Sequence, residues 1–80
     1  MRTVVADLLN TKGRDVVTVH PDDTIMEAAK VLLRHRIGVV VVVDRRQCLA
    51  GILSERDVVR AFATEGEEAG TASVRSYMTA

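Results

Sequence analysis

Five consecutive valines at positions 39–43 constrain this chain more than any other feature. Valine is branched at Cβ and stiff at χ1, so the run favours an extended strand. Successive side chains of a strand point to opposite faces, and a run without polar alternation therefore needs apolar cover on both faces. The polar residues 44–47 and the apolar residues 48–54 then predict a hairpin, with a return strand beside the valines.

A strand and a helix are expected before the valines. Residues 16–19 predict a strand that ends near Pro21, because proline lacks the N–H donor of a sheet. Thr24 and Glu27 match a capping box, in which each side chain bonds the other residue's backbone N–H group. The apolar residues behind this cap repeat at the spacing of one helix face: Ile25, Ala28, Ala29, Leu32 and Leu33.

A second helix is expected after the return strand. Ser54 is the predicted N-cap of a helix over residues 55–65, and Gly66 is the predicted stop. Residues 67–70 are predicted to form an exposed loop. The order strand, helix, strand, strand, helix indicates a mixed α/β (α+β) fold, whose first two strands are parallel and joined by a right-handed crossover.

This topology places both helices on one face of a three-stranded sheet. The other face is then an apolar patch, which soluble proteins seldom leave exposed. A second sheet is expected to cover it, either from the same chain in tandem or from another copy in a homodimer.

Short segments at both ends support a paired arrangement. Residues 3–9 predict a helix of about two turns, too short to be stable alone. Residues 74–79 resemble residues 5–10. We therefore assign residues 1–70 to one domain and residues 71–80 to a linker helix that leads to a second unit.

The composition limits the kinds of partner that the chain is expected to bind. The 11 acidic and 11 basic residues give a formal net charge of 0, which argues against non-specific binding to nucleic acid. Apolar runs are much shorter than the roughly 20 residues that span a membrane, so no membrane insertion and a cytoplasmic location are expected. Cys48 is the single cysteine, which excludes an internal disulfide, and its place on a predicted buried strand indicates a small core residue.

Neither a metal site nor a catalytic site is predicted. His20 and His35 are not spaced as ligands on one element, and no pair of cysteines supports them. Catalysis needs a nucleophile, a base and an orienting group within reach of one another. Ser54 has no histidine nearby in sequence and is already the predicted helix cap, so no enzyme activity is expected.

Four pieces of the sequence resemble the cystathionine-β-synthase (CBS) domain family. They are Val-Thr-Val-His-Pro-Asp-Asp-Thr-Ile at 17–25 with Glu27-Ala28, then Ile37, then Val-Val-Asp at 42–44, then Gly-Ile-Leu-Ser-Glu-Arg-Asp at 51–57. The resemblance covers roughly residues 4–66 in order and spacing. The last residues resemble the linker helix into a second CBS repeat.

The resemblance implies a regulatory module in which two repeats pair through their sheets. The clefts between such repeats bind adenosyl ligands such as AMP, ADP, ATP, NAD or S-adenosylmethionine. A helix N-terminus favours anionic groups. The resemblance assigns Asp57 to the ribose hydroxyls and Ser54 to the ribose or phosphate, and we expect Arg56 to be within reach of a phosphate. It also assigns to the cleft the backbone around Thr18 and Val19, which reads the adenine edge, and a lining of Ile37, Val39 and Val40.

The chain departs from the family pattern at three places. Val41 stands where the family usually has proline, Gln47 where it usually has a hairpin glycine, and Gly38-Val39 where phosphate-binding members often have a basic residue. These departures indicate modest contacts with phosphate. A second interpretation remains open, because Ser54 and Asp57 also form a self-sufficient capping pattern, and the domain would then be a structural dimerisation domain without a ligand.

Overall fold

The valine run forms the central strand of a three-stranded sheet in this computed structural model, which describes residues 17–80. The elements in chain order are β1 (Thr18–Val19), α2 (Ile25–His35), β2 (Val39–Val43), β3 (Leu49–Ser54), α3 (Glu55–Glu65) and two 3-10 helices, η1 (Gly66–Thr71) and η2 (Val74–Ser76). The predicted β-α-β-β-α order is confirmed. The helix predicted within residues 3–9 lies outside the described residues.

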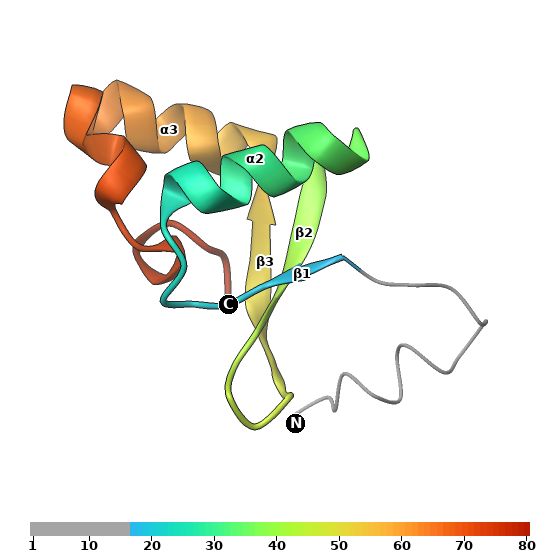
Figure 1. Ribbon diagram of the computed structural model, residues 1–80. Helices are drawn as coiled ribbons and strands as arrows, with labels where there is room; N and C mark the ends of the chain where they lie inside the picture. Colours follow the sequence, from blue (N-terminus) through green and yellow to red (C-terminus); the bar gives the residue numbers. More distant parts are fainter. Residues whose placement is uncertain (1–16) are drawn as a thin grey trace.

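The sheet order is β1-β2-β3, with β1 parallel to β2 and β2 antiparallel to β3. Figure 1 shows α2 and α3 side by side next to the sheet, which they cover on one face. A core of buried side chains joins these layers: Ile25, Ala28 and Leu32 of α2, Val40, Val42 and Leu53 of the sheet, and Ala61 of α3. The fold class predicted from the sequence is therefore confirmed.

Both helices begin at the predicted capping boxes. Thr24 Oγ1 accepts a hydrogen bond from the Glu27 backbone N–H at 3.0 Å, and Glu27 Oε1 accepts one from the Thr24 N–H at 2.9 Å. Ser54 and Asp57 repeat this arrangement at the start of α3. Gly66 is the C-cap of α3 with a φ of 63°, which glycine adopts without steric cost.

Two predictions about burial were wrong. Leu33 was placed on the buried stripe of α2, but its side chain is 80% exposed, because the buried face of α2 is centred on Ile25, Ala28 and Leu32. Residues 67–70 were predicted to form an exposed loop. They belong to the 3-10 helix η1, and the Ala69 side chain is fully buried against the core.

Residues 71–80 pack onto the domain instead of forming one continuous helix. The Ala72 carbonyl accepts from the Ile25 N–H at 2.8 Å, and Val74 is completely buried. Thr79 forms an antiparallel bridge with Ile52 of β3, through two hydrogen bonds of 2.8 and 2.9 Å. A boundary at residue 70 therefore cuts through packed structure, whereas the expectation that a second repeat follows stays a prediction.

Gly51 makes this close approach possible. A Cβ atom at position 51 would lie 2.3 Å from the Thr79 carbonyl oxygen, so any larger side chain would collide with the backbone there. Within residues 17–80, none of the helices has the length and apolarity that a membrane crossing requires.

Candidate functional site

The sheet has one face packed against the helices and one open face. Residues paired across strands project from the same face, and Thr18, Val41 and Ile52 form one such row while Val39 and Ser54 form the next. We call these five residues the open face. The side chains of Val39 and Ile52 are 48% and 45% exposed, whereas Val40 and Val42 are buried beneath the helices. The bare apolar face expected from the sequence is present among the described residues.

The open face brings together three of the predicted site residues, Thr18, Val39 and Ser54. Val39 lies directly opposite Ser54, and Thr18 lies on the far strand, one row along. With strands about 4.8 Å apart and a rise of about 3.3 Å per residue, Thr18 and Ser54 are separated by roughly 12 Å across this face. A ligand that touches both would have to lie diagonally across the valines.

Val19 and Val40 do not lie on that face. Their side chains are 6% and 1% exposed and belong to the core, so the assignment of Val40 to a cleft stays a prediction about its backbone. The reason is that the side chains of neighbouring strand residues point to opposite faces of the sheet. Only the backbone of these two residues remains available to a ligand.

Ile37 is not one of the five residues of the open face. It packs against the core and lines a groove of about 320 Å³ between the two helices, together with Leu33, Val58 and Val59. Residue 37 precedes β2, so strand alternation does not fix the direction of its side chain. Arg56 is exposed on the first turn of α3.

Ser54 and Asp57 form the polar end of the open face. Asp57 Oδ2 accepts from the Ser54 backbone N–H at 2.9 Å and from the Ser54 hydroxyl at 3.0 Å, while the Ser54 Oγ accepts from the Asp57 N–H at 3.1 Å. Arg60 Nη2 lies 3.3 Å from Asp57 Oδ1. The Asp57 side chain is 13% exposed.

These contacts fix the charge of Asp57. Burial raises the pKa of its carboxyl, but the hydrogen bonds from the Ser54 backbone and hydroxyl and from Arg60 outweigh burial, so the pKa is below its usual value of 3.8. Asp57 is therefore an ionised, partly buried acceptor at neutral pH. A carboxylate in this state can accept hydrogen bonds from two neighbouring hydroxyl groups.

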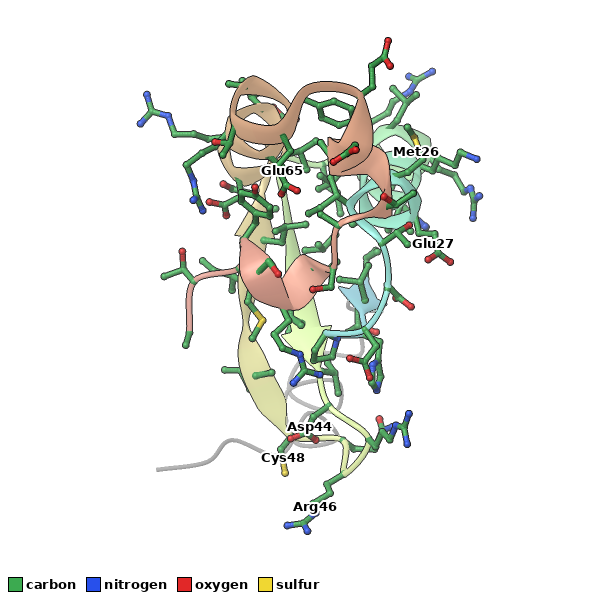
Figure 2. All side chains as sticks on the ribbon, turned by 90° about the vertical axis from the view of Figure 1, so that its left-hand side faces the viewer. Met26, Glu27, Asp44, Arg46, Cys48 and Glu65 are labelled. Atoms are coloured by element: carbon green, nitrogen blue, oxygen red, sulfur yellow. The ribbon has the colours of Figure 1, made fainter. Side chains whose placement is uncertain are left out.

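A second polar cluster lies beside the hairpin between β2 and β3. Asp22 meets Arg75 at 2.6 Å, Arg45 at 3.9 Å and His20 at 3.9 Å, beside a cavity of about 410 Å³. Figure 2 shows Asp44, Arg46 and Cys48 together at this hairpin, at the opposite end of the molecule from Glu65. The sequence did not reveal the cluster, because residues 71–80 were expected to lead away from the domain.

Asp44 organises the turn between β2 and β3. Asp44 Oδ1 accepts from the Arg46 N–H at 2.8 Å and the Cys48 N–H at 3.0 Å, which closes the turn. Gln47 adopts a φ of 62°, the left-handed conformation for which the family uses glycine. In the part of the chain that the structure describes, no three His, Cys, Asp or Glu side chains are grouped to hold a metal ion.

The structure is a small α/β domain whose sheet has one exposed apolar face. Comparison with known proteins agrees: the sequence profile of the CBS domain family matches residues 5–64, and the chain belongs to this family. A CBS-domain protein of Agrobacterium tumefaciens of known structure is 52% identical, with a TM-score of 0.79 over 94% of this chain and 56% of that one.

Two further relatives bear on function. A mitochondrial CBS domain-containing protein of Arabidopsis thaliana is 32% identical over 96% of this chain and 40% of its own length. A CBS domain protein of Pyrobaculum aerophilum, solved in complex with AMP, is 26% identical, with a TM-score of 0.74 over 84% of this chain and 51% of that one. The chain thus spans about half the length of these relatives.

Proposed function

We propose that this CBS domain is a regulatory unit that binds an adenosyl compound between two paired CBS repeats. The candidates are AMP, ADP, ATP, NAD and S-adenosylmethionine. The observation that supports this best is the ionised Asp57 carboxylate, partly buried at the end of the exposed apolar face beside Val39. The AMP complex of a related CBS domain protein adds support.

In this proposal the two ends of the ligand meet different surfaces. The ribose hydroxyls donate to Asp57, and the Ser54 hydroxyl lies next to them because it bonds the same carboxylate. The base lies over the apolar part of the open face, with Val39 beneath it and the Thr18–Val19 backbone at its edge. Arg56 is exposed on the first turn of α3 and is the cation proposed for a phosphate, and the valine at position 39 adds no charge.

The open face is the proposed pairing surface, covered by a second repeat or by a second copy of the chain. Val39 and Ile52 leave about half of their surface exposed there, and burying them against a partner is favourable by roughly 25 cal/mol per Å². The paired unit is proposed to be non-catalytic and cytoplasmic. Ligand binding then shifts the packing of the two repeats, which an attached domain or partner senses.

A nucleotide panel in a thermal-shift assay tests the ligand. A compound present at a hundredfold excess over its Kd stabilises the folded state by about 2.7 kcal/mol, and it should raise the melting temperature by roughly 10–20 °C. We expect at least one adenosyl compound to do so with the wild type and none to do so with Asp57→Asn.

The capping box of α2 provides a matched control. Glu27→Gln weakens an equivalent cap but leaves the open face unchanged, so this variant should keep the full ligand response. If no adenosyl compound stabilises the wild type, or if Asp57→Asn responds as the wild type does, the ligand proposal fails.

A second function is favoured by one observation. Asp57 already accepts three hydrogen bonds within α3, from the two Ser54 donors and Arg60, and Glu27 serves a similar cap without any ligand assigned to it. On this interpretation the chain is a structural dimerisation domain.

The pairing surface has its own test. Sedimentation of Ile52→Lys measures whether the open face mediates pairing, and Leu33→Lys on the exposed helix face is its control. Loss of the dimer in Ile52→Lys alone supports pairing through the sheet. Loss in Leu33→Lys alone contradicts it.

A further inference from the structure

Arg60 connects the candidate ligand site to the C-terminal segment of the chain. Its Nη2 atom donates to Asp57 Oδ1 at 3.3 Å and to the Tyr77 carbonyl at 2.9 Å. Its guanidinium also lies over the Tyr77 ring, 5.1 Å from the centroid. One side chain on α3 therefore contacts both the carboxylate proposed for the ribose and a residue that is 17 positions further along the chain.

Tyr77 is the anchor of the C-terminal segment. The residue is only 7% exposed, and its hydroxyl donates a hydrogen bond to Glu65 at the end of α3. Two residues later, Thr79 exchanges two backbone hydrogen bonds with Ile52 on the edge of β3. Tyr77 thus holds the chain against α3 two residues before Thr79 pairs with the sheet.

The hydrogen bonds at Asp57 leave little room for a ligand. A carboxylate offers about four acceptor positions, and the two at Oδ2 are filled by the N–H and hydroxyl of Ser54. Arg60 occupies one position at Oδ1, which leaves one. A ribose presents two neighbouring hydroxyls, so binding both of them requires a second position, and the exposed Arg60 contact at 3.3 Å is the weakest of the three.

We propose that Arg60 couples ligand binding at Asp57 to the packing of residues 77–80 on β3, so that each of the two weakens the other. A ligand that takes Oδ1 displaces Arg60 from Asp57 and loosens the C-terminal segment, and the seated segment lowers the affinity for the ligand. The two effects are equal in magnitude, because coupling between two binding equilibria is reciprocal. This inference rests on the proposed function, since it requires a ligand that donates to Asp57.

The test combines amide hydrogen exchange with calorimetry. The Ile52 and Thr79 amides report on the seated segment, since each is bonded to the other residue's carbonyl. Adenosine is the probe, because it has the ribose but no phosphate that would respond to the charge of Arg60. We expect Arg60→Ala to speed exchange of both amides by about threefold to tenfold, which is the range for losing a partly exposed charged hydrogen bond.

The same variant should bind adenosine about threefold to tenfold more tightly than the wild type. Saturating adenosine should speed exchange of the Thr79 amide in the wild type and have no further effect in Arg60→Ala. Arg34→Ala is the control, because it removes an exposed arginine from the last turn of α2, on a different helix from Arg60, and it should change neither quantity.

Two outcomes separate this inference from the proposed function. If adenosine binds the wild type but leaves the Thr79 amide unchanged, and Arg60→Ala binds no more tightly, the coupling is overturned and the ligand site stands. If adenosine binds neither protein, the coupling to a ribose ligand fails, and the nucleotide panel decides the proposed site by itself. The contact between Asp57 and the C-terminal segment through Arg60 can also be tested without a ligand. Asp57→Asn should speed exchange of the Thr79 amide when Arg60 is present and should have no effect when it is combined with Arg60→Ala.

Discussion

Gly51→Ala is the most direct test of how residues 71–80 belong to the domain. Gly51 lies on β3, where an added Cβ would come within 2.3 Å of the Thr79 carbonyl oxygen and 3.1 Å of its carbon. Both are backbone atoms, so no side-chain rotation relieves the collision. We expect Thr79 to move away from Ile52 and its two hydrogen bonds to break.

The size of the effect follows from those bonds. Each intramolecular hydrogen bond contributes about 1 kcal/mol, which gives a loss of about 2 kcal/mol. Replacing glycine by alanine also lowers the conformational entropy of the unfolded chain, which raises the free energy of unfolding by about 0.4–1 kcal/mol. The free energy of unfolding should therefore fall by about 1–1.5 kcal/mol, and the melting temperature of a domain this small should fall by roughly 4–10 °C.

Gly70→Ala is the matched control. A Cβ at position 70 would lie 3.4 Å from the end of the flexible Met26 side chain, an ordinary contact distance. Urea unfolding of the two variants measures the difference in stability, and amide exchange of Ile52 and Thr79 locates it. If Gly51→Ala is as stable as Gly70→Ala and Thr79 stays protected, the segment is not seated on β3 as described.

Three further changes test other parts of the structure. Gln47→Gly should raise the free energy of unfolding by about 0.5–1 kcal/mol in urea titrations, because glycine adopts the φ of 62° at this turn without strain; no gain would contradict the strain. Leu53→Ala should cost about 2–5 kcal/mol by the same measurement, since Leu53 is fully buried between sheet and helices, and a cost under 1 kcal/mol would contradict that packing. The lowered pKa of Asp57 adds stability above its unfolded value of 3.8, and this stability is lost as pH falls through the lower folded value. Between pH 6 and pH 2 the wild type should therefore lose more stability than Asp57→Asn, and equal losses would refute the assignment.

Local patterns in the sequence were sufficient to predict the elements and most of the fold. The valine run became the central strand, and the capping patterns at Thr24 and Ser54 became the first turns of α2 and α3. These predictions succeed because β-branched runs and caps act over a few neighbouring residues. The unbroken apolar character of β2 also indicated a face that the described part of this chain leaves exposed.

The tertiary structure decided which side chains share a surface. Neighbouring valines were assigned to one cleft, but the strand pairing sends Val39 to the open face and Val40 into the core. The packing of residues 71–80 depends on the contact of Gly51 with Thr79 and of Arg60 with Tyr77, between residues distant in sequence. The sequence alone determined where strands and helices begin. Only the folded chain determined that Arg60 links the C-terminal segment to the Asp57 carboxylate of the capping motif, because these contacts depend on how the layers pack.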